Sequence, residues 1–180
     1  MTFDETRIAR AVRDLLAGAG VDPDCPELRE TPSRVAEYWR ERLAGYGADV
    51  ALELQALPGD LVPCPVILER VPFVSTCEHH LAPFSGTACI GYLAGEHGTV
   101  GLSKLVRVVN AFAHRLQVQE RMTHQIFDAL ETHLRPRAWA VKLVAEHTCM
   151  SHRGVKVPGV PVTTLLLGGD WKENPPSPFR

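Results

Sequence analysis

Two short clusters of thiols and imidazoles hold the side chains in this sequence that are best suited to chemistry. The first is Cys77-Glu78-His79-His80, and the second, much later in the chain, is His147-Thr148-Cys149. Cys and His bind zinc most tightly, and the Cys and the last His of the first cluster can share one ion if the chain turns there. If the second cluster is a strand, its His and its Cys point to the same face. Together the clusters predict one zinc site, with the ligands Cys77, His80 and Cys149.

Three protein ligands, rather than four, are typical of a catalytic zinc, which keeps one position open for water. Two further imidazoles, His79 and His147, lie beside the proposed ligands and could serve as acid and base. The spacing of the clusters does not match the paired C-x-x-C units of zinc fingers and ribbons. The other cysteines have no His neighbour and are interpreted as small buried residues: Cys25, Cys64 and Cys89. The residues alone therefore indicate a catalytic zinc and leave its substrate open.

Length and composition are those of a soluble globular protein. The 180 residues suit one domain with a sizeable core, and 45% are hydrophobic while 22% are charged. A net charge of −2 gives no basic field that would attract nucleic acid. An odd count of five Cys, without a signal peptide, predicts reduced thiols and the cytoplasm. No apolar run approaches the length that spans a membrane, so no membrane partner is expected.

The N-terminal part, residues 1–47, is predicted to be a helical segment. Apolar residues recur at helical spacing over 4–17, and Thr31-Pro32 is typical of a helix start with the Thr as N-cap. The second helix is predicted to stop near Gly45 or Gly47. Arg34 lies in its first turn, where the helix dipole does not favour a cation. Two interpretations of Arg34 stay open, a solvated charge or part of an anion site.

Residues 48–180 are predicted to form one α+β domain that follows an irregular connector over 48–65. Ser103 is expected to cap the first helix of this domain, and the Pro-rich tail is expected to be loose. Four strands would pair into an antiparallel sheet with two helices on one face, and its open edges invite pairing with neighbouring subunits. The predicted order is strand 66–76, strand 84–93, helix 103–114, helix 118–134, strand 138–149 and strand 160–167.

Five motifs in a fixed order strongly resemble the GTP cyclohydrolase I family, over roughly residues 4–169. They are Glu-Thr-Pro-Ser-Arg at 30–34, Cys-Glu-His-His-Leu at 77–81, Gly-Leu-Ser-Lys-Leu at 101–105, Arg-Leu-Gln-Val-Gln-Glu-Arg at 115–121, and His-Thr-Cys-Met with Arg-Gly at 147–154. The resemblance implies a hydrolase acting on cyclic amidines, which converts GTP to 7,8-dihydroneopterin triphosphate and formate. This is the first step of folate and tetrahydropterin biosynthesis.

The resemblance also implies a fold and an assembly. The domain over 48–180 would have the tunnelling fold (T-fold), in which the sheets of several subunits join edge to edge into a barrel. The assembly would be a homodecameric ring with active sites at subunit interfaces. Neighbouring subunits would then supply some of the site residues that lie far apart in sequence, among them Arg34, Cys77, Ser103, Glu120 and Arg153.

The catalytic roles that the resemblance implies agree with the residue chemistry. Zinc on Cys77, His80 and Cys149 would activate water for attack on C8 of guanine. His147 would protonate the ring nitrogen as the ring opens, and His79 would assist nearby proton transfers. Ser103 would lie at the sugar, Glu120 would accept two N–H bonds from guanine, and Gln119 would support Glu120. The apolar residues around the base would be Val100, Leu102 and Val118. The cations on the triphosphate would be Lys104, Arg107, Arg153 and Arg34.

Three alternatives stay open from sequence. The segment Val160–Leu166 is less polar than the family leads one to expect, and the loop over 94–99 lacks the usual Pro. These departures allow a paralogue that serves a specialised deazapurine or pterin pathway. A second alternative is a non-catalytic scaffold stabilised by zinc. A third is another T-fold enzyme, a pyruvoyl-tetrahydropterin synthase or a nitrile reductase, neither of which would be expected to pair Cys-Glu-His-His with a distal His-x-Cys.

Overall fold

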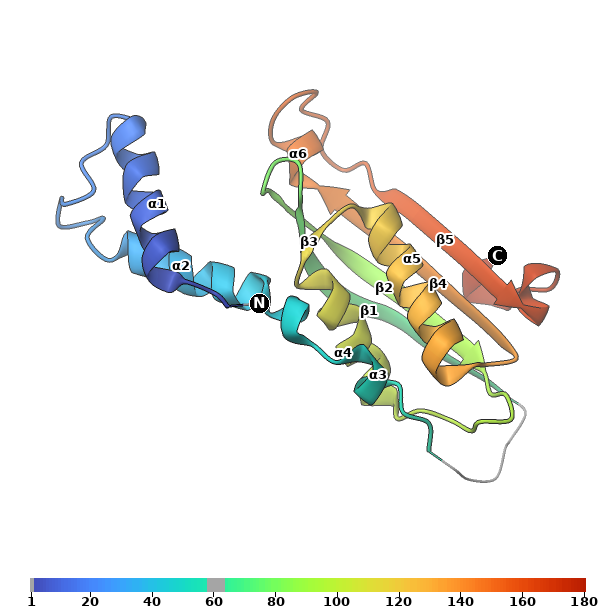
Figure 1. Ribbon diagram of the computed structural model, residues 1–180. Helices are drawn as coiled ribbons and strands as arrows, with labels where there is room; N and C mark the ends of the chain where they lie inside the picture. The colour runs from blue at the N-terminus through green and yellow to red at the C-terminus, as the bar shows by residue number, and fades with distance from the viewer. Residues whose placement is uncertain (1, 58–63) are drawn as a thin grey trace.

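The sheet of the main domain is built from two antiparallel strand pairs. The computed structural model describes residues 2–57 and 64–180 (Figure 1). Strand β1 (Pro65–Cys77) pairs with β2 (Pro83–Leu93), and β4 (Ala138–His147) pairs with β5 (Val162–Gly169). The two pairs are joined by an antiparallel β2–β4 ladder in which Phe84 lies opposite His147. This ladder brings the end of β4 beside the loop that follows β1.

A short fifth strand extends the predicted four-stranded sheet. Residues Leu116–Gln117 (β3) lie parallel to Thr76 and Cys77 at the end of β1, giving the order β3-β1-β2-β4-β5. A strand of two residues carries no alternation of polar and apolar side chains, so sequence periodicity does not predict it. The α+β class is confirmed, and apart from β3 the order of the elements is ββααββ, in agreement with the T-fold that the resemblance implies.

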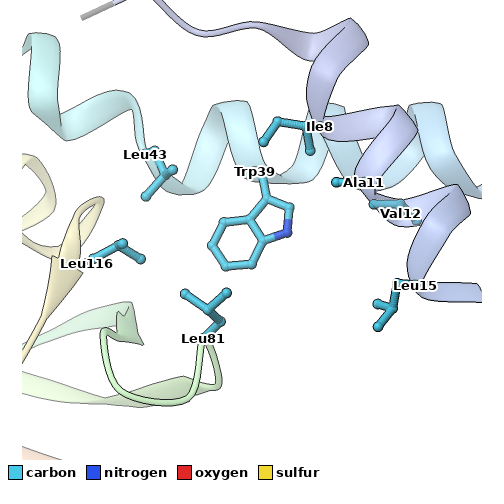
Figure 2. Close-up of a pocket in the computed structure, with 8 residues that line it drawn as sticks. All are labelled: Ile8, Ala11, Val12, Leu15, Trp39, Leu43, Leu81 and Leu116. Atoms are coloured by element: carbon cyan, nitrogen blue, oxygen red, sulfur yellow. The ribbon is translucent and has the colours of Figure 1, made fainter. Parts of the chain in front are cut away.

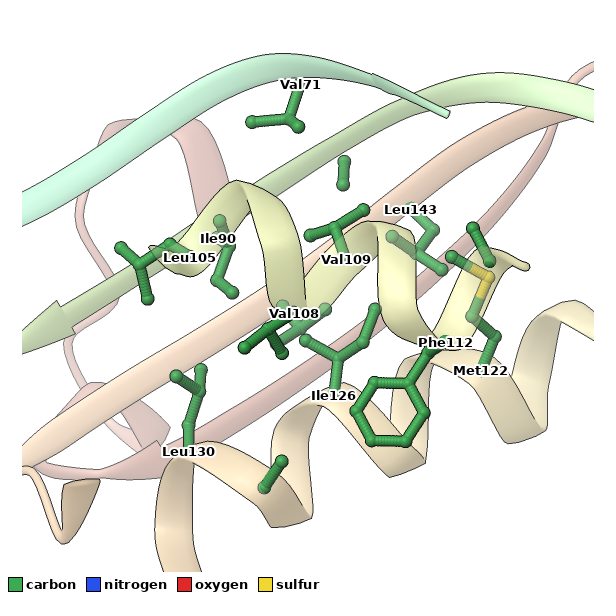
Figure 3. Packing of buried hydrophobic residues seen from close by; sticks show 14 of the residues in the cluster. Val71, Ile90, Leu105, Val108, Val109, Phe112, Met122, Ile126, Leu130 and Leu143 are labelled. Atoms are coloured by element: carbon green, nitrogen blue, oxygen red, sulfur yellow. The ribbon is translucent and has the colours of Figure 1, made fainter. Parts of the chain in front are cut away.

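Two helices cover one face of the sheet (Figure 1). They are α4 (Leu102–Ala113) and α5 (Gln119–Ala129), and α5 continues into a π-helical turn over Leu130–Leu134. Their apolar stripes pack against the strands to form the main core (Figure 3). The fully buried residues in this layer include Leu105, Val108, Met122, Ile126, Ile90 and Leu143. This core fixes the start of α5 beside the end of β1.

Several boundaries differ from the sequence prediction. Ser103 is not the N-cap of α4, because the helix starts one residue earlier and Gly101 occupies the cap position. The predicted connector over 48–65 contains a one-turn helix, α3 (Val50–Glu53), which is capped by the Asp49 side chain. Residues 58–63 of that connector lie outside the described residues. One turn is too short to show helical periodicity, and this is why the prediction missed it.

The N-terminal helices stand apart from the sheet (Figure 1). They are α1 (Glu5–Gly18) and α2 (Thr31–Arg42), which is followed by a 3₁₀ turn over Ala44–Gly47. Glu30, rather than Thr31, occupies the N-cap position of α2. The apolar faces of these helices border an open cavity of about 440 Å³ (Figure 2). It is lined by Ile8, Ala11, Val12, Leu15, Trp39, Leu43, Leu81 and Leu116. Among the described residues, no helix is both long and apolar enough to cross a membrane.

The C-terminal tail is packed, so the expectation of a loose tail is wrong. Two 3₁₀ turns, Asp170–Lys172 and Ser177–Phe179, fold it back against the sheet. Trp171 and Phe179 stack with ring centroids 5.8 Å apart and form a second apolar cluster with Ala138 and Ala140. Because side chains alternate along β4 and Trp139 packs against Phe127 of α5, this cluster lies on the face opposite the helices. Burial of the Trp171 and Phe179 rings stabilises the packed tail despite its prolines.

Replacing Phe179 with alanine should lower the free energy of unfolding by about 3 kcal/mol, since a buried aromatic side chain leaves a cavity when it is truncated. Phe179 is 1% exposed. Urea unfolding monitored by circular dichroism would measure the change. Glu173→Ala, an exposed substitution in the same tail, should stay within about 0.5 kcal/mol of wild type. Equal stability of the Phe179 and Glu173 variants would show that the tail adds nothing to the core.

Candidate active site

The first cluster forms a tight loop between β1 and β2. The Leu81 N–H donates to the Cys77 carbonyl at 2.9 Å, and the Cys77 N–H donates to the Ala82 carbonyl at 2.8 Å. Leu81 adopts a left-handed conformation with φ of 52°, which is uncommon for a residue other than glycine. The turn brings His80 back over the start of the loop, so that its Nδ1 lies 3.8 Å from Cys77 Sγ. The chain therefore turns here, which is the condition for Cys77 and His80 to share one ion.

The second cluster reaches the loop through a helical turn rather than a strand. Strand β4 ends at His147, and Thr148–Ser151 form a short helix, α6, that carries Cys149. The expectation of a strand through residue 149, with His147 and Cys149 on one face, is therefore wrong. A single turn has no periodicity that could have revealed it. The residues nevertheless meet, and one ligand atom each from Cys77, His80 and Cys149 lies within 4.8 Å of the others.

This donor set fits zinc. Two thiols and an imidazole are zinc ligands, and zinc–ligand bonds of about 2.0–2.3 Å need only small side-chain adjustments from the observed separation. Cys77 is buried, while Cys149 is half-buried. Burial and the neighbouring Cys77 thiol raise the pKa of the Cys149 thiol above its ordinary value. A cation bound between the thiols would reverse this effect, because metal coordination favours the thiolate.

His147 is held firmly beside this cluster. Its imidazole stacks on the Phe84 ring, with centroids 4.5 Å apart and planes 6° apart. Its Nε2 lies 2.8 Å from Oε1 of the buried Gln119. Burial lowers the pKa of His147 from its ordinary value, and the nearby Glu120 carboxylate acts in the opposite direction. An imidazole held in this way beside a carboxylate is suited to take up and pass on a proton.

Charged side chains surround the loop on its exposed side. Arg121, on α5, forms an ion pair with Glu78, and this pairing holds the pKa of the Glu78 carboxyl below its ordinary value. His79 Nε2 lies 3.6 Å from Glu78 Oε1. Arg153 donates from Nη1 to His80 Nε2 at 3.3 Å, which places this predicted triphosphate ligand at the metal cluster. Sequence reasoning gave no role to Glu78 or Arg121, although both lie within the quoted motifs.

A second group of predicted site residues lies at the other end of the sheet. Helix α4 starts after the far end of β2 and runs back toward β3, which pairs with Cys77. Ser103 therefore lies roughly 15 Å along α4 from the end of the helix that is near β3 and Cys77. Lys104 Nζ donates to the Leu52 carbonyl at 3.3 Å, and Arg107 pairs with Glu53 at 3.4 Å. These cations contact α3 rather than the metal cluster.

One chain therefore brings together only part of the predicted site. The residues at the metal end are Cys77, His79, His80, Val118, Gln119, Glu120, His147, Cys149 and Arg153. The residues at the far end are Val100, Leu102, Ser103, Lys104 and Arg107. Arg34 is exposed on α2, outside both groups, and no hydrogen bond or ion pair of the described residues joins it to either. Val100 is 4% exposed, whereas Leu102 is 59% exposed and free to meet a ligand.

The fold and the cluster define an enzyme of the T-fold class with a candidate metal centre. A family model described as GTP cyclohydrolase I matches residues 8–178. GTP cyclohydrolase 1 of Mycobacteroides abscessus is 46% identical over 173 residues, which cover 96% of this chain and 85% of that protein. GTP cyclohydrolase 1 of Corynebacterium glutamicum is also 46% identical, over 96% of this chain and 88% of that protein. The chain belongs to the GTP cyclohydrolase I family and is an enzyme.

Among solved structures, the apo form of the archaeosine synthase QueF-Like is similar to this chain. The TM-score is 0.47 and the identity 14%, over 60% of this chain and 96% of that one. This likeness is too distant to bear on function.

Proposed function

We propose that this chain hydrolyses and rearranges GTP to 7,8-dihydroneopterin triphosphate and formate, in a zinc-dependent reaction. This is the entry step to folate and other pterins, and we place it in the cytoplasm. The observation that carries the proposal is the meeting of Cys77, His80 and Cys149 within 4.8 Å, with His147 beside them. We also propose a division into an N-terminal helical segment, 1–47, and a catalytic domain, 48–180.

Zinc would be held by Cys77, His80 and Cys149. When bound, it supplies a Lewis acid that activates water for hydrolysis at guanine C8. The protein residues supply the proton transfers. His147, fixed between Phe84 and Gln119, gives a proton to the ring nitrogen as the ring opens. His79, which is exposed beside Glu78, assists later proton transfers.

The first turn of α5 supplies the proposed guanine site. Glu120 is exposed there, and an ionised carboxylate can accept hydrogen bonds from both N1–H and the amino group of guanine. Adenine lacks this pair of donors, so Glu120 would select the base. Val118 is half-buried at the N-cap of the same helix and would contact the face of the base. Arg153, close to His80, would hold one end of the triphosphate.

A complete site requires at least two copies of the chain. The sugar and phosphate residues Ser103, Lys104 and Arg107 lie at the opposite end of the sheet from the metal cluster, so a neighbouring subunit would supply them. The sheet has edges that could pair with a neighbouring subunit. Among the described residues, β5 is an edge strand and β1 is paired on its outer side only by the two residues of β3. Such edges pair with other strands. We propose a closed homodecameric ring with sites at the interfaces, to which Arg34 is contributed by a further subunit.

The reaction product tests this proposal. The zinc-loaded protein is incubated with GTP, formate is quantified, and pterin fluorescence is recorded after oxidation. Equal amounts of formate and pterin triphosphate are expected, and ATP should give neither. Release of phosphate without formate, or the absence of any pterin from GTP, would overturn the proposal.

Replacing Glu120 with alanine should weaken GTP binding by about 2–5 kcal/mol, because a carboxylate that accepts two hydrogen bonds is lost. This corresponds to at least about a 30-fold higher Kd. Calorimetry with a guanine triphosphate analogue that resists hydrolysis would measure it. Glu131→Ala, an exposed change beyond the other end of α5, is the matched control and should leave affinity unchanged. Unchanged affinity in the Glu120 variant would place the base elsewhere.

A further inference from the structure

A buried chain of hydrogen bonds lies behind His147, and its hydroxyl groups have no role in the reaction as described. Gln119, 1% exposed, contacts His147 through Oε1 at 2.8 Å. Its Nε2 reaches the Val162 carbonyl at 2.9 Å and Thr164 Oγ1 at 3.1 Å. Thr164 Oγ1 lies 2.6 Å from Thr123 Oγ1, and Thr123 donates to the Gln119 carbonyl at 2.9 Å. The chain thus connects β5 to the catalytic histidine through α5.

The carbonyl groups fix the orientation of the Gln119 amide. The Val162 carbonyl, and that of Leu143 at 3.3 Å, can only accept hydrogen bonds, so the amide nitrogen must face them. The amide oxygen therefore faces His147, and it too can only accept. The hydrogen between them belongs to His147 Nε2. In the neutral imidazole, Nδ1 is then the nitrogen without a proton.

The two hydroxyl groups complete the chain in one direction only. Thr123 donates its hydroxyl hydrogen to the Gln119 carbonyl, so its oxygen accepts a hydrogen bond from Thr164. Thr164 donates to Thr123 and accepts from Gln119 Nε2. Thr164 Oγ1 at 3.1 Å is a nearer acceptor for the second amide hydrogen of Gln119 than the Leu143 carbonyl at 3.3 Å. Rotation of the amide by half a turn would set its oxygen against the Val162 carbonyl and leave Thr164 without a donor.

We propose that Thr164 is a positioning residue that locks Gln119, so that His147 keeps its hydrogen on Nε2 and exchanges protons with the substrate through Nδ1. The inference rests on the proposed function and adds a residue to it. When His147 acts as an acid, the proton on Nδ1 passes to the ring nitrogen of the substrate, and the Nε2 hydrogen remains on the bond to Gln119. Thr164 acts on the chemical step through His147 and does not touch the substrate.

The test compares three substitutions on β5. Thr164→Val keeps the branched shape and removes the hydroxyl, and it should lower kcat about tenfold with a change in KM of less than about twofold. Thr164→Ser restores the hydroxyl and should recover most of the rate. Thr163→Val makes the same change at the neighbouring exposed position, which points away from Gln119, and should leave the rate at the wild-type level. Zinc content should be equal in all of them.

A double-mutant cycle separates positioning from general destabilisation. In a His147→Ala background, whose rate is itself about 10²-fold lower, Thr164→Val should cause no further loss. An equal tenfold loss in that background, or a raised KM with unchanged kcat, would overturn the inference. Failure of the serine variant to recover the rate would also do so.

A readout independent of turnover keeps the inference testable if the proposed reaction is wrong. Nitrogen-15 spectra of histidine-labelled, zinc-loaded protein should show His147 as the Nε2–H tautomer, with the signal assigned by its loss in His147→Ala. In Thr164→Val the same histidine should populate both tautomers. A single Nδ1–H tautomer in the wild type, or identical spectra of wild type and Thr164→Val, would refute the inference. Absence of GTP turnover would refute only the proposed function.

Discussion

Replacing Cys149 with alanine should remove bound zinc and turnover together. The substitution leaves one thiol and one imidazole at the cluster, and two ligands hold zinc far more weakly than three. Turnover should fall by more than about 10²-fold, since even the loss of a residue that only supports a ligand costs this much. Zinc per subunit, measured by mass spectrometry after dialysis, and formate release from GTP give the two readings.

Cys89→Ala is the matched control for this variant. Cys89 is half-buried on β2, and burial raises the pKa of its thiol to about 11, so it stays protonated and is a poor metal ligand. This variant should keep full zinc and full activity. Full zinc occupancy in Cys149→Ala would show that the cluster is not the metal site, whereas zinc loss without loss of turnover would show that the metal is structural.

Two inactive variants should restore activity when they assemble together. Cys77→Ala disables the metal end of the chain, and Lys104→Ala combined with Arg107→Ala disables the far end. If each site takes its metal half from one subunit and its phosphate half from another, about a quarter of the sites in a random mixed ring are intact. Co-expression with two different affinity tags, tandem purification and a formate assay would measure about a quarter of wild-type activity.

The same experiment with Cys77→Ala and Glu120→Ala should give no recovery. The first turn of α5 follows β3, which pairs with Cys77, so both residues lie at the metal end of one chain. Every site in the mixed rings then lacks either the Cys77 thiol or the Glu120 carboxylate. Recovery with this pair, or none with the first, would mean that the site is not divided between the two ends of the chain.

The candidate metal cluster could be predicted from sequence because Cys and His residues by their type alone indicate metal ligands. Cys77, His80 and Cys149 are the Cys and His residues that have further His neighbours, and this chemistry does not depend on the path of the chain. The path itself was harder to predict. Cys149 enters the cluster on the one-turn helix α6, and a single turn leaves no periodic pattern.

The boundary of α4 and the packing of the tail were predicted wrongly from the local preferences of single residue types for caps and loops. In the folded chain, tertiary packing decides both. Ser103 has the preferred chemistry of an N-cap, yet α4 begins before it, at Leu102, and Gly101 at the N-cap position gives no side-chain cap. The tail contains three prolines after residue 174, but Trp171 and Phe179 bury enough apolar surface to hold it against the sheet. The hydrogen bonds of Gln119 with Thr164 link residues far apart in the chain, and no local pattern could predict them.

The ladder between β2 and β4 has a consequence for how the protein folds. The β1–β2 and β4–β5 pairs are hairpin-like, whereas Phe84 and His147 are 63 residues apart in the chain, with both helices between them. We expect contacts between such distant residues to form last, because closing a long loop costs more entropy than closing a hairpin. The cluster needs that docking step, because Cys77 and His80 follow β1 while Cys149 follows β4. Zinc would therefore stabilise contacts made after the rate-limiting barrier. Removing it with a chelator should speed unfolding in stopped-flow measurements and leave the refolding rate nearly unchanged.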